Sequence, residues 1–123
     1  VPYRYLAGAI EVALKAHFTD KTNWRNMLRN ETNDELNLAS FQQSVRELLP
    51  QEFEEYYTPN TPITEVVYPV LNYPKKVKSI SLDKQPEITS RLTGIRGQYW
   101  LLGDGRVFNI RKHSGYFIQL SVG

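Results

Sequence analysis

The 123 residues of the chain are enough for one domain, or for one domain with an appended helical segment. Hydrophobic residues make up 41% and charged residues 23% of the chain, and no apolar run approaches the length of a membrane span. The absence of cysteine excludes a disulfide framework and a thiolate metal site, and we expect a cytoplasmic protein with no membrane partner.

The net charge of +2 hides an uneven distribution. Residues 1–63 carry 6 Lys+Arg against 9 Asp+Glu, whereas residues 64–123 carry 9 against 4. A basic half favours an anionic partner such as DNA or RNA, and the alternative is ordinary surface charge that keeps the protein in solution.

The first part of the chain has apolar residues at helical spacing. The pattern predicts a helix over about residues 5–18 and a short helical turn at residues 24–28. Thr32 and Glu35 have the spacing of a capping box, which predicts that the next helix begins there.

Pro50 sets the end of that helix near Leu49, because proline cannot continue it. Residues 51–57 have the composition of one more acidic helical turn. We therefore assign residues 1–57 to a helical segment. Residues 58–64 form a Pro/Thr linker, where two prolines and three threonines predict an extended connector.

Beyond the linker, the propensities favour strands over residues 65–71, 77–82 and 87–95. Pro69 restricts the first of these to a sheet edge or a bulge. Residues 65–123 are thus predicted to form a β-sheet or barrel module. The expected fold is α+β, with N-terminal helices followed by a small, curved, mainly antiparallel β-sheet or barrel of five to six strands.

Two turns organise the C-terminal third of the chain. Asp104-Gly105 predicts a hairpin with a two-residue loop, and residues 113–115 predict a second hairpin with Gly115 in a left-handed conformation. A two-residue loop at the first turn and a three-residue loop at the second place the same residues on the same face of the three strands, so the two turns predict one strand register. That register places the following residues on the core face: Tyr99, Leu101, Phe108, Ile110, Ile118 and Leu120.

The opposite face of this predicted meander mixes aromatic rings, amides and cations. Sheets that bind single-stranded nucleic acid present aromatics for base stacking and cations for phosphates. The alternative is that this face packs against the helices or closes a barrel, which would bury its aromatic rings. The candidate nucleic-acid-binding residues are Arg96, Gln98, Trp100, Asn109, Arg111, Lys112, His113 and Phe117.

Residues typical of catalysis or metal binding are few. Glu11 and Lys15 have the spacing of a surface ion pair on a helix, and His17 with Asp20 lacks the further ligands that a metal needs. No Ser/His/Asp arrangement and no phosphate-binding glycine loop can be recognised. We expect no cofactor and no catalysis by this chain alone.

Several separate stretches resemble one protein family. They include Glu11-Val-Ala-Leu-Lys15, Tyr68-Pro-Val-Leu-Asn-Tyr-Pro74 and Gly94-Ile-Arg-Gly-Gln-Tyr99. They resemble the C-terminal part of an uncharacterised prokaryotic family, domain of unknown function 2797. The resemblance implies an upstream part with a zinc ribbon and a motif similar to that of GIY-YIG endonucleases. It also implies that Glu11 is a weak candidate for the place of a metal-binding glutamate.

The first two residues, valine and proline, lead us to expect that the chain is either processed or, as we favour, a fragment of a longer protein. The leading hypothesis is a non-catalytic C-terminal module that binds nucleic acid through its basic β half. One alternative is a structural or protein-interaction domain that docks the missing N-terminal part. Another is the remnant of a GIY-YIG-like nuclease fold. The type of nucleic acid and the oligomeric state stay open.

Overall fold

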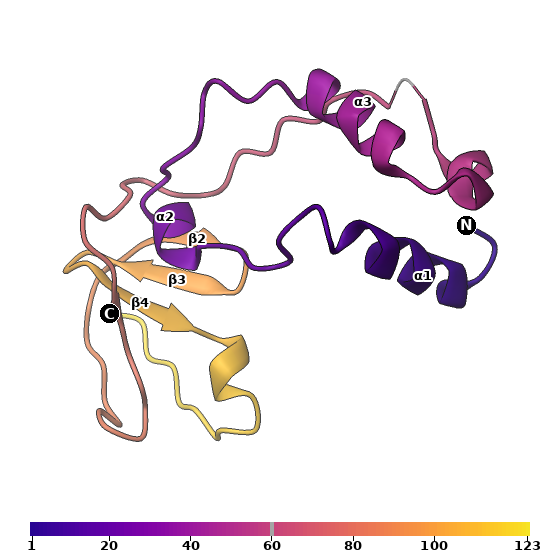
Figure 1. Cartoon of the computed structure of the whole chain (residues 1–123). Helices are drawn as coiled ribbons and strands as arrows, with labels where there is room; N and C mark the ends of the chain where they lie inside the picture. Colours follow the sequence, from indigo (N-terminus) through magenta and orange to yellow (C-terminus); the bar gives the residue numbers. More distant parts are fainter. Residues whose placement is uncertain (60) are drawn as a thin grey trace. The chain divides into compact units, whose positions relative to one another are not determined.

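The computed structural model describes residues 1–59 and 61–123, and the chain divides into two compact units (Figure 1). The helical unit comprises Val1–Asn23 and Thr32–Glu65, and the sheet unit comprises Trp24–Glu31 and Val66–Gly123. The short turn at residues 24–31 therefore belongs with the strands, although its sequence neighbours on both sides belong with the helices. None of the helices among the described residues is long and apolar enough to cross a lipid bilayer.

The helical unit contains two α-helices and a 3-10 helix. Helix α1 spans Arg4–Leu14, helix α3 spans Leu38–Leu48 and the 3-10 helix η1 spans Gln51–Tyr56. The first helix is confirmed, but it ends four residues before the predicted position, and the chain continues in turns to Phe18. The Phe18 ring packs edge-on against Phe41 of α3, with 5.4 Å between the ring centroids.

The start of α3 differs from the prediction. Asn37 is the N-cap, and its side-chain oxygen accepts a hydrogen bond of 3.1 Å from the backbone N–H of Ser40. The predicted capping box is wrong, because the Thr32 hydroxyl donates to Asp34 instead. Asparagine is at least as good a cap as threonine, so Asn37 satisfies one of the orphan N–H groups of the helix five residues further along the chain. The predicted end near Leu49, before Pro50, is confirmed.

The sheet unit holds a four-stranded sheet in the order β1-β4-β3-β2 (Figure 1). The strands are β1 (Lys78–Ser79), β2 (Leu92–Arg96), β3 (Tyr99–Leu102) and β4 (Arg106–Asn109). Neighbours β2–β3 and β3–β4 are antiparallel, whereas β1 runs parallel to β4. The α+β class is confirmed, but the sheet is mixed and open, so the prediction of a barrel or of five to six strands is wrong.

The β3–β4 hairpin forms at the predicted place with a register shifted by one residue. Leu101 lies opposite Val107, and Trp100 lies opposite Phe108. The loop has three residues rather than two, with Gly105 at φ 84°, and the Asp104 side chain accepts from the Arg106 backbone N–H at 3.0 Å. Because a one-residue shift exchanges the two faces of a strand, Phe108 lies beside Trp100 and not beside Leu101.

The predicted second hairpin does not form. After β4 the chain enters a 3-10 helix, η2 (Arg111–His113), and residues 114–123 contain no strand. Gly115 does adopt the expected left-handed conformation, with φ 87°. The physical reason lies in the sheet order: β1 already occupies the edge of β4 that a following strand would need.

Two small apolar clusters lie on opposite faces of the sheet. Helix α2 (Trp24–Leu28) packs on one face, where the buried cluster is Leu28, Leu101 and Val107. The other face carries the buried cluster Ile80, Leu102 and Phe108, with Trp100 partly buried against it.

The predicted strand over residues 65–71 is reduced to a bridge between Val70 and Gly94, in keeping with Pro69.

Candidate nucleic-acid interface

The eight predicted binding residues do not share one face of the sheet. Trp100 lies on the Phe108 face, where its ring is 6.1 Å from the Phe108 ring. Arg96 and Asn109 both lie opposite Tyr99, which belongs to the α2 face. The structure therefore separates residues that the predicted register had brought together. What each of them contacts decides which are free to bind a partner.

Arg96 fastens α2 to the sheet. Its Nη1 donates to the backbone oxygen of Met27 at 2.8 Å and to the side-chain oxygen of Asn30 at 3.0 Å. Its guanidinium also lies over two aromatic rings, 4.9 Å from the centroid of Tyr68 and 5.4 Å from that of Tyr73. These contacts occupy much of the guanidinium, so Arg96 contributes to packing within the unit.

Gln98 and Asn109 bind each other and the start of η2. The Gln98 amide donates to the side-chain oxygen of Asn109 at 3.1 Å, and the same oxygen accepts from the backbone N–H of Lys112 at 3.2 Å. Both amides are half-buried. They close the end of the β3–β4 pair and begin the turn that follows.

His113 is buried, with 4% of its surface exposed. Its Nδ1 lies 2.8 Å from the Asn109 carbonyl oxygen, and its Nε2 accepts from the backbone N–H of Leu82 at 3.2 Å. A carbonyl can only accept and an amide N–H can only donate, so the ring is neutral with its proton on Nδ1. The ring also stacks on Phe108, with 4.6 Å between centroids, and meets Tyr116 edge-on.

Tyr116 extends this contact to the loop that follows β1. Its hydroxyl donates to Asp83 at 2.6 Å, which raises the pKa of Tyr116, because the bond to the carboxylate favours the neutral phenol. His113 and Tyr116 thus attach the C-terminal segment to the loop through two separate polar contacts.

Arg111, Lys112 and Phe117 are exposed. The Phe117 ring is fully accessible, and it borders a shallow surface pocket together with Leu82 and Ile118. Neither cation has an ion-pair partner among the described residues. Of the eight predicted residues, these three have side chains that solvent reaches freely.

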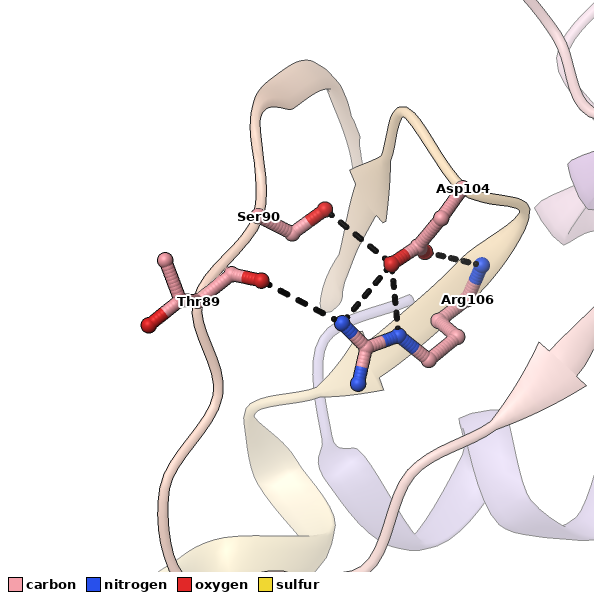
Figure 2. Close-up of polar contacts among 4 residues, drawn as sticks. All are labelled: Thr89, Ser90, Asp104 and Arg106. Atoms are coloured by element: carbon pink, nitrogen blue, oxygen red, sulfur yellow. Dashed lines mark hydrogen bonds and ion pairs between the residues drawn. The ribbon is translucent and has the colours of Figure 1, made fainter.

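The β3–β4 loop carries the most connected polar group of the sheet unit (Figure 2). Arg106 forms an ion pair of 2.7 Å with Asp104, which also accepts from the Ser90 hydroxyl at 3.2 Å. The Arg106 guanidinium reaches the Thr89 carbonyl oxygen at 3.4 Å. The hydrogen bond from Arg106 holds the pKa of Asp104 at about 2, well below its ordinary value. The Arg106 guanidinium therefore holds the loop in place, and its positive charge is paired with the Asp104 carboxylate.

Charge separates more sharply between the two units than between the two halves of the sequence. The sheet unit has 11 Lys+Arg and 4 Asp+Glu, whereas the helical unit has 4 and 9. Within the described part of the chain, eight exposed cations of the sheet unit have no ion-pair partner. They are Arg25, Lys75, Lys76, Lys78, Lys84, Arg91, Arg111 and Lys112.

An aromatic stack that the sequence analysis missed lies on the α2 face. The Trp24 indole is parallel to the Tyr99 ring, with 5.7 Å between centroids and 5° between planes. The Arg25 guanidinium lies 4.3 Å from the centroid of the indole. Among the described residues, Arg25 contacts only Trp24 in this way.

Glu11 lies exposed on α1. The predicted ion pair between Glu11 and Lys15 is wrong, since Lys15 pairs with Asp20 at 3.1 Å. Over residues 1–59 and 61–123 the structure contains no group of three or more histidine and acidic side chains that could hold a metal ion. The role of Glu11 that the resemblance implies stays a prediction.

The fold and the free cations define a small α+β protein with a basic sheet unit. The chain belongs to a family described as proteins of unknown function (DUF2797), whose sequence profile matches residues 1–118. The resemblance found in the sequence is thereby confirmed. The zinc ribbon and nuclease-like motif expected upstream stay predictions. No curated protein and no solved structure shows a significant match to the chain.

Proposed function

We propose that the sheet unit binds nucleic acid. The observation that carries this proposal is the set of eight exposed lysines and arginines that have no carboxylate partner among the described residues, in a unit with 11 cations and 4 acidic residues. Cations that are already neutralised by a carboxylate of the protein contribute little to the binding of an external anion. Free ones release counterions when phosphates replace the surrounding salt, which is the main source of affinity in sequence-independent binding.

Three of these cations follow one another along the free edge of the sheet. Lys78 lies on the edge strand β1, and Lys75 and Lys76 lie in the turn that leads into it. Lysines at an edge also prevent pairing with other sheets, and that role alone requires no ligand. A role in phosphate binding makes a further prediction, namely a salt-dependent affinity for nucleic acid.

The test compares two variants with the same change in charge. The edge variant replaces Lys75, Lys76 and Lys78 by glutamine, and the control replaces three cations of the helical unit, Arg4, Lys15 and Lys21. Binding of a labelled oligonucleotide is followed by fluorescence anisotropy between roughly 50 and 200 mM salt.

A plot of log K against log salt concentration has a negative slope. We expect the magnitude of this slope to decrease by about 2 in the edge variant and by much less in the control. Absence of binding by the parent protein at the lowest salt would overturn the proposal. So would an equal loss of affinity in both variants, because the sheet unit would then have no special role. Binding of anionic vesicles but not of oligonucleotides would point to a membrane surface and would also refute it.

A second candidate function concerns the helical unit, in which none of the residues of α1, α3 or η1 is buried. A groove between these helices is lined by apolar side chains, among them Ile10, Val45 and Phe53. With 4 Lys+Arg against 9 Asp+Glu, the unit complements a basic partner. We infer a protein-interaction role in which the groove takes a basic amphipathic helix. Chemical shift changes at Ile10 and Val45 on addition of such a model peptide, but not of its acidic counterpart, test this role.

A further inference from the structure

We propose that Trp24 receives an unpaired base, so that the nucleic acid bound by the sheet unit is single-stranded. This inference rests on the proposed function and adds to it the substrate class and the stacking residue. It starts from the Trp24 stack, in which the indole contacts both the Tyr99 ring and the Arg25 guanidinium.

The indole is held in place before any ligand arrives. One of its faces is stacked on Tyr99 of β3, and Trp24 also packs against the buried cluster that contains Leu28 and Leu101. A side chain that is already held by contacts with both a strand and a helix loses little conformational freedom when a ligand binds. Trp24 therefore presents a rigid surface for stacking.

The indole also carries the guanidinium of Arg25, 4.3 Å from its centroid, and Arg25 is an exposed side chain with no ion-pair partner among the described residues. Stacking of a base on an aromatic ring is a stronger contact than an exposed cation–π contact. A base can therefore displace the guanidinium from the ring. Once displaced, Arg25 is available to the phosphate next to that base.

The other two aromatics that the sequence suggested are less suited to this role. Trp100 packs on Phe108 and joins the buried cluster of the opposite face. Phe117 is fully exposed and has no aromatic neighbour among the described residues that would hold its ring. A paired base keeps its faces stacked within the duplex, so only single-stranded nucleic acid can use Trp24.

The test uses the Trp100→Phe variant of the full chain, in which Trp24 is the one remaining tryptophan. Its fluorescence is recorded while a single-stranded oligonucleotide, the corresponding duplex or inorganic polyphosphate is added. Binding itself is measured in parallel by anisotropy of the labelled oligonucleotide. We expect the single strand to quench Trp24 strongly, and the duplex and polyphosphate to quench it weakly.

In a second arm, Trp24→Leu is expected to lower the affinity for the single strand roughly tenfold. The control Tyr5→Ala, which removes an exposed ring of the helical unit, should leave the affinity unchanged. Binding of the oligonucleotide without quenching of Trp24 would overturn the stacking role and leave the proposed function intact. Quenching by polyphosphate as strong as that by the single strand would overturn it as well, because displacement of Arg25 would then suffice. Absence of any binding would overturn both proposals.

Discussion

Replacing His113 by phenylalanine should destabilise the sheet unit, although the new side chain is also a flat, apolar ring. Phenylalanine keeps the stack on Phe108 and the edge contact with Tyr116. It removes both polar contacts of the imidazole, those with the Asn109 carbonyl and the Leu82 N–H. The substitution therefore isolates the hydrogen bonds from the packing.

The magnitude follows from the two backbone groups that lose their partner. A buried donor or acceptor left without a hydrogen bond costs about 1–3 kcal/mol. Asn109 and Leu82 are both half-buried, so water can compensate in part. We expect a loss of about 2–3 kcal/mol in the free energy of unfolding, which is a large share for a domain whose total stability is of the order of 5–15 kcal/mol.

The assay is urea unfolding at neutral pH followed by tryptophan fluorescence. Trp24 and Trp100 are both in the sheet unit, one on each face, so the signal reports on that unit. Phe117→Ala is the matched control, because it removes an aromatic ring four residues away that is fully exposed. A loss below about 0.5 kcal/mol in His113→Phe would refute the assigned hydrogen bonds, because surface substitutions without a structural role have effects of this size.

Three further substitutions test other contacts of the sheet unit. Arg106 holds the pKa of Asp104 at about 2 instead of 3.8, so this contribution to stability is present above pH 3.8 and is lost as the pH falls toward 2. Asp104→Asn should therefore flatten the acid dependence of the urea midpoint between these values, by at most about 1 kcal/mol because the Asp104 carboxylate is exposed. Gly94→Ala should cost about 1–3 kcal/mol, since its Cβ would lie 2.8 Å from a methyl group of Val70, and it should expose the amides of Leu71 and Ile95, which form hydrogen bonds across this contact, to hydrogen exchange. Arg96→Met should cost about 2 kcal/mol and speed amide exchange in α2, because the hydrogen bonds from Arg96 to Met27 of α2 and to Asn30 just after it would be lost.

Local signals in the sequence were sufficient to predict those elements whose formation depends on residues close together in the chain. Helix α2 lies where its spacing predicts, and the β3–β4 hairpin forms around Asp104-Gly105. The register was wrong because Asp104 bonds to the Arg106 N–H and lengthens the loop by one residue. A dipeptide predicts that a turn forms, but the side-chain contacts within the turn decide its length.

The larger errors arose from contacts between distant residues. Strand β1 pairs with β4 across residues 78 and 106, and this parallel pairing excludes the predicted second hairpin. No local pattern shows that an edge is already occupied. The Trp24 stack has the same origin, since Trp24 and Tyr99 are far apart in the chain. A tryptophan in the polar stretch after residue 19 was the one local signal that could have identified it.

The cations of the sheet unit differ in what they contact. All of its lysines are free of ion pairs in the described part of the chain, whereas Arg29, Arg96 and Arg106 hold backbone, amide or carboxylate partners within the unit. This division follows from chemistry, because the planar guanidinium makes several directed bonds while an ammonium group acts as a mobile point charge.

A surface whose free cations are mostly lysines attracts phosphates without reading base edges, since bidentate contacts to bases come mainly from arginine, asparagine and glutamine. The amides of Gln98 and Asn109 bind each other and are not available for such contacts. We therefore expect oligonucleotides of the same length but different sequence to bind with similar affinity. A strong preference for one sequence, measured by anisotropy with a set of such oligonucleotides, would contradict the assignment of Arg96, Arg106 and the two amides to internal contacts.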